Sequence, residues 1–105
     1  MAEVPNHIIK HIKDYIKILN EKGFTIQQAI LFGSFANGKY NEFSDIDLAL
    51  VSDKFEGIRF NDRNLIRKYK FDINADIEPI PFTQADFIKK DPFVKEILET
   101  GLRII

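Results

Sequence analysis

Residues 45–51 constrain the fold of this chain more than any other segment. They begin with Asp45 and Asp47, and apolar residues fill the positions between and after these acids. Side chains two residues apart on a β-strand lie on the same face, so this pattern predicts a strand that carries both carboxylates on one side. Ile46 and Leu48 would then point into a core on the other side and fix the register of the strand. The segment therefore predicts a buried strand with an acidic end.

The spacing of apolar residues predicts the other elements. Apolar residues recur every three or four positions over residues 5–21, which indicates an amphipathic helix with one buried face. A short apolar run at 29–32 ends at Gly33 and is typical of a buried strand. We further predict a single domain over 1–105, of small mixed α/β (α+β) type with helices packed on a sheet. The remaining predicted elements are a short helix at 34–36, a helix at 61–70, a strand over 71–81 with Ile73, Ile77 and Ile80, a turn or short helix at 83–87, a helix at 91–101, and a short strand or docked segment at 102–105.

Composition excludes several classes of protein. The chain has 105 residues, no cysteine and a formal net charge of −1. Disulfides, thiolate metal sites and cysteine nucleophiles are therefore excluded, and a reducing, cytoplasmic location is expected. The neutral charge balance gives no general attraction to nucleic acid, which is not an expected partner. No apolar run approaches the ~20 residues that cross a bilayer, so no contact with a membrane is expected.

Two short motifs carry the chemistry. Gly33 and Ser34 lie where a predicted strand ends and a predicted helix begins, which suits the binding of phosphate oxygens. Asp45 and Asp47 bring two carboxylates together, and such a pair is costly unless a cation such as Mg²⁺ offsets the repulsion. Each motif alone is weak evidence, because Gly-Ser pairs are common in turns and aspartates often coat a strand end.

The two motifs together resemble the signature of the polymerase-beta-like nucleotidyltransferase superfamily. That signature is Gly-Ser, then ten residues, then Asp-x-Asp, and here ten residues separate Ser34 from Asp45. The short chain, with Gly33-Ser34 and the run from Ser44 to Leu48, is closer still to the minimal nucleotidyltransferases. Many members of that group pair with helical HEPN-type proteins, often as antitoxin to toxin.

The resemblance implies a set of metal-binding carboxylates. Asp45 and Asp47 would hold two Mg²⁺ ions, and a third carboxylate from the following strand would join them. Asp76 and Glu78 are both candidates for this third position, with Glu78 slightly favoured, and either one could accept the proton of the acceptor. A glutamate in place of the usual aspartate would be a departure from the family pattern.

The resemblance also implies the substrates. Gly33 and Ser34 would hold the phosphates of ATP or another NTP, and Lys39 could reach a phosphate, although a solvated surface lysine is the simpler interpretation. The expected reaction moves AMP from ATP onto a HEPN-type partner or a second subunit, since a chain this short has no additional domain to hold the acceptor. A non-catalytic antitoxin and a transferase acting on a small molecule remain alternatives.

The basic residues of 59–70 could contact nucleic acid or an acidic partner. Because the overall charge is close to neutral, we interpret them instead as a solvated helix face. They are Arg59, Arg63, Arg67, Lys68 and Lys70.

Overall fold

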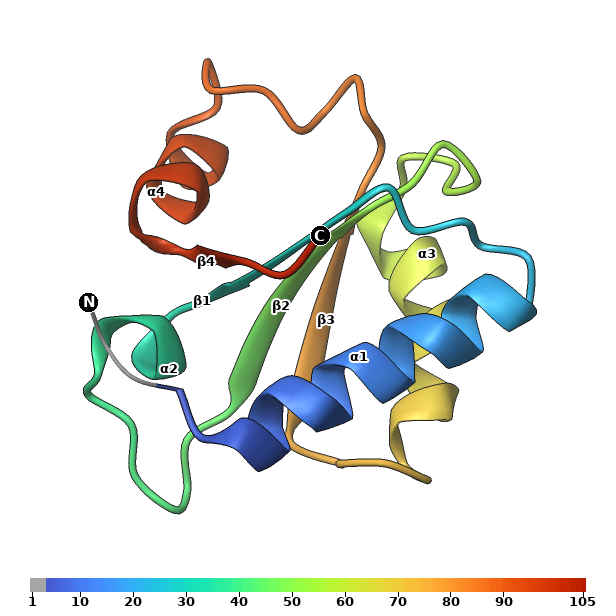
Figure 1. The fold of residues 1–105 in the computed structure, drawn as a ribbon. Coiled ribbons are helices and arrows are strands. Elements are labelled where there is room, and N and C mark those ends of the chain that lie inside the picture. Colours follow the sequence, from blue (N-terminus) through green and yellow to red (C-terminus); the bar gives the residue numbers. More distant parts are fainter. Residues whose placement is uncertain (1–3) are drawn as a thin grey trace.

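Four strands form one mixed sheet in the computed structural model, which describes residues 4–105 (Figure 1). The strand order is β3-β2-β1-β4. β1 (Gln28–Phe32) runs antiparallel to β2 (Ile46–Val51) and to β4 (Leu102–Arg103). β2 runs parallel to β3 (Ile77–Phe82). The predicted mixed α/β fold is confirmed.

Helices cover both faces of this sheet (Figure 1). α1 (Asn6–Glu21) and the end of α3 (Arg59–Ile66) pack on one face, whereas α4 (Pro92–Thr100) packs on the other. The short α2 (Ser34–Asn37) joins β1 to the loop before β2, and a 3₁₀ helix, η1 (Arg67–Lys70), continues α3. In residues 4–105, no helix combines the length and the apolar character needed to cross a membrane.

The expected helix faces form the core. In α1 the buried side chains recur at helical spacing, as predicted from the sequence. α4 lies within the helix predicted at 91–101 and begins at Pro92, where the Asp91 carboxylate accepts a hydrogen bond of 2.8 Å from the Phe93 N–H. The buried residues of α1 are Ile8, Ile12, Tyr15, Ile16 and Leu19.

The third strand begins later than the sequence suggested. Residues 71–76 form turns and irregular structure, and β3 starts only at Ile77. The carbonyl of Lys70 accepts hydrogen bonds from the N–H groups of Ile73 and Asn74, and the Asn74 side chain accepts one from the Asp76 N–H. These local bonds take the place of a strand ladder.

Two other boundaries differ by a few residues. β2 begins at Ile46, so Asp45 lies just before the strand and not within it. The helix predicted at 61–70 starts earlier, at Arg59, and becomes a 3₁₀ helix from Arg67.

Candidate active site

Asp47 lies where three strands meet. In the register of the sheet it pairs with Phe32 of β1 on one side and with Glu78 of β3 on the other. Its neighbours along β2, Ile46 and Leu48, are fully buried on the opposite face. The alternation of residues along β2 therefore places the Asp47 and Glu78 side chains on the same face of the sheet, in adjacent strands.

Gly33 closes the site from the side of β1. Its φ of +73° lies in a region that side-chain-bearing residues rarely adopt. A Cβ atom at this position would lie 2.4 Å from Oδ2 of Asp47. The strand–helix turn that carries Gly33 and Ser34 thus approaches the acids directly, and only glycine leaves room for the Asp47 carboxylate.

The loop between the two motifs is held by its own polar groups. Gly38, with φ of +80°, ends α2 in a left-handed conformation. The Ser44 hydroxyl accepts a hydrogen bond of 2.9 Å from the Asn41 N–H, and the Asn41 side chain accepts one of 2.8 Å from the Phe43 N–H. Lys39 is exposed on this loop. The loop ends at Asp45, which is exposed and lies directly before β2 at the edge of the site.

The electrostatic environment of Asp47 suits a cation. Burial raises the pKa of the Asp47 carboxyl, and the nearby negative charges of Asp45 and Glu78 raise it further. A bound cation would favour the charged form of Asp47 and so lower its pKa, because it offsets the mutual repulsion of the carboxylates. The carboxyl oxygens are also the ligands that Mg²⁺ prefers.

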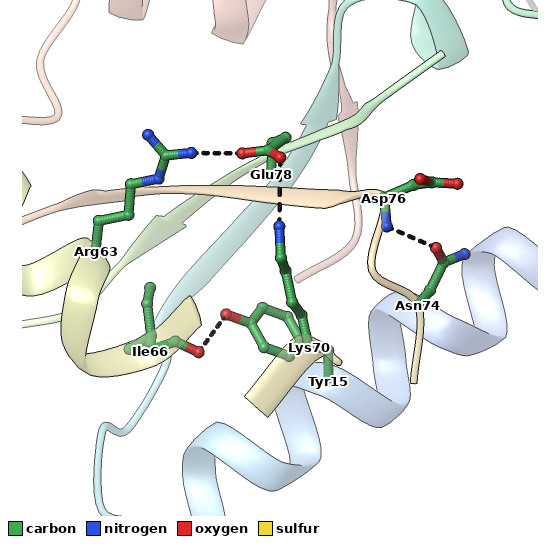
Figure 2. Close-up of polar contacts among 7 residues, drawn as sticks. All are labelled: Tyr15, Arg63, Ile66, Lys70, Asn74, Asp76 and Glu78. Carbon is green, nitrogen blue, oxygen red and sulfur yellow. Dashed lines mark hydrogen bonds and ion pairs between the residues drawn. The ribbon is translucent and has the colours of Figure 1, made fainter. Parts of the chain in front are cut away.

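Glu78 is held by two cations (Figure 2). Its Oε2 atom accepts a hydrogen bond of 2.5 Å from Nη2 of Arg63, and its Oε1 atom lies 3.3 Å from Nζ of Lys70. The Lys70 side chain is only 3% exposed. The interpretation of the basic residues as a solvated face is therefore wrong for Lys70, whereas Arg63 remains 44% exposed while it binds Glu78.

Asp76 lies apart from this arrangement. It is exposed just before β3, and Figure 2 shows its carboxylate directed away from Glu78. Asp76 lines a pocket of about 320 Å³ together with Ser44, Asn74 and residues of α1, and neither Asp47 nor Glu78 lines this pocket. Of the two candidates for the third carboxylate, the strand register brings Glu78 alongside Asp47.

The acids are not gathered into a ready metal site. Over residues 4–105, no group of three or more His, Asp or Glu side chains is close enough to hold a metal ion together. Both oxygens of Glu78 are instead directed to the cationic nitrogens of Arg63 and Lys70. The residues present fit a divalent cation in chemistry, because all three are carboxylates, but Glu78 would have to turn an oxygen toward Asp47 to bind it.

Comparison with known proteins gives a family match over most of the chain. The family model described as "Polymerase beta, Nucleotidyltransferase" matches residues 12–105. A protein of Methanocaldococcus jannaschii described as "Putative protein adenylyltransferase" is 38% identical over 96 residues, which cover 88% of this chain and 92% of that protein. A second protein of this organism with the same description is 29% identical over 98 residues, which cover 92% and 95%.

Solved structures share the fold. A "putative nucleotidyltransferase" from Sulfolobus solfataricus superposes with a TM-score of 0.65 at 20% sequence identity, covering 91% of this chain and 78% of that one. A structure described as "the toxin-antitoxin with AMP-PNP" gives a TM-score of 0.64 at 19% identity, covering 96% and 73%. At these identities the two structures support the mixed sheet and its helices, and the family match rests on the sequence comparisons.

Proposed function

This chain belongs to the polymerase beta nucleotidyltransferase family, and we propose that it transfers AMP from ATP onto a hydroxyl group of a partner protein in a Mg²⁺-dependent reaction. The observation that carries this proposal is the contact between the two motifs. The turn at Gly33 and Ser34 faces the Asp47 carboxylate, with Asp45 and Glu78 beside it. Phosphate-binding and cation-binding groups therefore share one site.

The carboxylates would hold the metal. Asp45 and Asp47 are the first ligands, and Glu78 is the third carboxylate of the set. When bound, Mg²⁺ neutralises charge on the triphosphate and on the leaving pyrophosphate and lowers the pKa of the acceptor hydroxyl. The raised pKa of Asp47 supports this assignment, since the site places negative charge where it is costly without a cation.

The turn at Gly33 would hold the nucleotide. The bare backbone of Gly33 allows close approach of the β- and γ-phosphates, and the Ser34 hydroxyl donates a hydrogen bond to them. Lys39 on the neighbouring loop adds a positive charge within the reach of a long side chain. The acceptor oxygen then forms a bond to the α-phosphorus, the bond to pyrophosphate breaks, and Glu78, the candidate that lies beside Asp47, takes the acceptor's proton.

The nature of the acceptor is supported by the relatives. The two Methanocaldococcus jannaschii proteins match this chain over nearly their whole length, and each is described as a "putative protein adenylyltransferase". A toxin–antitoxin structure with a bound ATP analogue shares the fold. We infer that the acceptor is a helical HEPN-type partner, modified as a toxin by its antitoxin.

Nucleotide binding tests the site without knowledge of the acceptor. Calorimetric titration with each NTP, with and without Mg²⁺, should show Mg²⁺-dependent binding of ATP that Asp45→Asn/Asp47→Asn abolishes. Asp53→Asn, which removes an exposed carboxylate just beyond the opposite end of β2, is the matched control and should bind as wild type. Binding of no nucleotide, or equal binding by the Asp45→Asn/Asp47→Asn variant, would contradict the proposed site.

Labelled ATP tests the transfer. The protein is incubated with a co-purified HEPN-type partner and ATP labelled at the α- or the γ-phosphate. Label from the α-phosphate alone should appear on the partner and should be lost with Asp47→Asn. Label found only on small molecules would favour the small-molecule acceptor, whereas neutralisation of the partner that persists in Asp45→Asn would favour antitoxin action by binding alone.

A further inference from the structure

The two cations that hold Glu78 differ in how firmly they are placed. Arg63 comes from α3 and binds one carboxylate oxygen, and Lys70 comes from η1 and binds the other (Figure 2). The three acids are not gathered around one point, so Glu78 must turn an oxygen toward Asp47 before it can act as the third metal ligand. Either Lys70 or Arg63 must then move away from the carboxylate.

Lys70 cannot leave its place easily. Its side chain is 3% exposed, and its ammonium lies above the ring of Phe71, 5.3 Å from the centroid. A buried ammonium without an anionic partner is strongly unfavourable. Lys70 therefore keeps its hold on the Oε1 atom of Glu78 in any state of the site.

Arg63 makes the shorter contact with Glu78, 2.5 Å against 3.3 Å for Lys70, but it can leave at a lower cost because it is far more exposed. Its side chain is 44% exposed, and only one terminal nitrogen, Nη2, reaches Glu78. The Nε atom is buried but has no hydrogen-bond partner among residues 4–105. Arginine binds carboxylates most firmly through two parallel hydrogen bonds, and this pair has a single one. The side chain can swing into solvent without leaving a buried charge behind.

We propose that Arg63 is a positioning residue that competes with the divalent cation for the Oε2 atom of Glu78. This inference rests on the proposed function, because it assigns Glu78 as the third ligand. Without the cation, Arg63 offsets the negative charge that Glu78 places beside Asp47. On binding of the cation, Arg63 moves away and Glu78 joins Asp47, while Lys70 keeps the other oxygen. Arg63 thereby sets the affinity of the metal site.

Direct measurement of metal affinity tests this competition. Free Mn²⁺, which shares the oxygen ligands of Mg²⁺, is followed by electron paramagnetic resonance during titration of the protein in the presence of ATP. Arg63→Met keeps the apolar stem and removes the competing charge, and it should tighten Mn²⁺ binding about tenfold, the size expected for loss of one charge-assisted hydrogen bond. Arg59→Met is the matched control, since Arg59 lies one turn away on α3 and packs on Phe82 and Phe93.

A second comparison separates competition from simple charge repulsion. In a Glu78→Gln background, Arg63→Met should change Mn²⁺ affinity little, because the ligand for which Arg63 competes is already gone. Circular dichroism checks the fold of each variant. The comparison of Arg63→Met with Arg59→Met stands even if Glu78→Gln fails to fold.

Failure of the proposed role of Arg63 and failure of the proposed metal site give different results. Wild-type binding that depends on Asp45 and Asp47, with no gain in Arg63→Met or with an equal gain in Arg59→Met, would overturn the role of Arg63 and leave the proposed function intact. A gain that persists in Glu78→Gln would overturn it equally. Absence of Mn²⁺ binding in every variant would overturn the metal site itself, and the inference with it.

Discussion

The Oδ2 atom of Asp47 lies 2.4 Å from the position that a Cβ atom on Gly33 would occupy. The Gly33-Ser34 turn and the Asp45–Asp47 segment, which are separate in the sequence, are thus in close contact in the fold. Any side chain at position 33 would displace the Asp47 carboxylate. The same contact brings the turn after β1 next to the acids of β2.

Replacement of Gly33 by alanine should damage both stability and activity. The residue has a φ of +73°, and the added methyl group would collide with Asp47. We expect Gly33→Ala to lower the free energy of unfolding by about 2–3 kcal/mol and to abolish Mg²⁺-dependent ATP binding. Urea denaturation and calorimetry measure the two effects.

Gly23→Ala is the control for backbone strain. Gly23 has a φ of +91°, and nothing lies within 4 Å of an added Cβ. This change should cost about 1 kcal/mol and leave ATP binding intact. If Gly33→Ala and Gly23→Ala lost equal stability and both still bound ATP, the close approach of Gly33 to Asp47 would be unimportant.

Asp47→Asn should stabilise the metal-free protein while it removes activity. The charged Asp47 carboxylate is disfavoured by burial and by the charges of Asp45 and Glu78, which raise its pKa. Removal of that charge should add about 1 kcal/mol to the free energy of unfolding at neutral pH, and AMP transfer should fall roughly 100-fold or more. Denaturation in the presence of a chelator and transfer of α-phosphate label measure the two effects.

The sign of the pH dependence provides a further check on Asp47. In the folded wild type, Asp47 takes up a proton at a higher pH than an ordinary aspartate does, which relieves the repulsion. The stability advantage of Asp47→Asn should therefore be full at neutral pH and shrink as the pH falls through the raised pKa. An advantage that grows toward acidic pH would contradict this account.

The ion pair of Lys70 with Glu78 predicts a non-additive pair of mutations. Glu78→Gln leaves the buried Lys70 ammonium without its carboxylate and should cost about 2–3 kcal/mol of unfolding free energy. Lys70→Met leaves Glu78 partly exposed and still paired with Arg63, and should cost less. The double variant should be more stable than the sum of the two losses predicts.

An exposed lysine serves as the control for this cycle. Lys68 lies in the same 3₁₀ helix, and its side chain is exposed. Lys68→Met should change the unfolding free energy by less than about 0.5 kcal/mol and should combine additively with Glu78→Gln. Additive losses for Lys70→Met and Glu78→Gln would show that the 3.3 Å contact contributes nothing.

The sequence predicted the fold well where the signals were local. The spacing of apolar residues in α1, the alternation in β2 and the cap at Asp91 each act within a few residues, and each appears in the structure. The start of β3 was wrong because Asn74 and Lys70 form turn hydrogen bonds with residues 73–76 that apolar spacing does not reveal. Local hydrogen bonds overrode the apolar pattern there.

The partners of Glu78 depend on tertiary packing. Arg63 and Lys70 look like members of a solvated basic helix in the sequence, and no local pattern separates them from Arg67 or Lys68. Only the packing of α3 and η1 against β3 buries Lys70 and brings Arg63 to the carboxylate. A glutamate in a half-buried strand does indicate that some cation must lie near it, but the sequence does not indicate which one.

Tyr15 ties α1 to the end of α3 by one buried hydrogen bond. Its hydroxyl donates to the carbonyl of Ile66 at 2.8 Å, and its side chain is fully buried (Figure 2). Tyr15→Phe leaves this carbonyl without its donor and should lower the free energy of unfolding by about 1–2 kcal/mol. Tyr40→Phe, at an exposed tyrosine, is the control and should have little effect.

The same variant should change how stability depends on alkaline pH. Burial raises the pKa of Tyr15 well above its usual range, so the folded protein keeps this hydroxyl protonated while the unfolded chain ionises near pH ~10. The unfolded state then binds fewer protons than the folded one, and wild-type stability falls as the pH rises beyond that point. Tyr15→Phe removes this contribution, so its deficit relative to wild type should narrow between about pH 10 and pH 11, as followed by urea denaturation. A deficit that stays constant over this range would show that Tyr15 ionises as readily in the folded protein as in the unfolded chain.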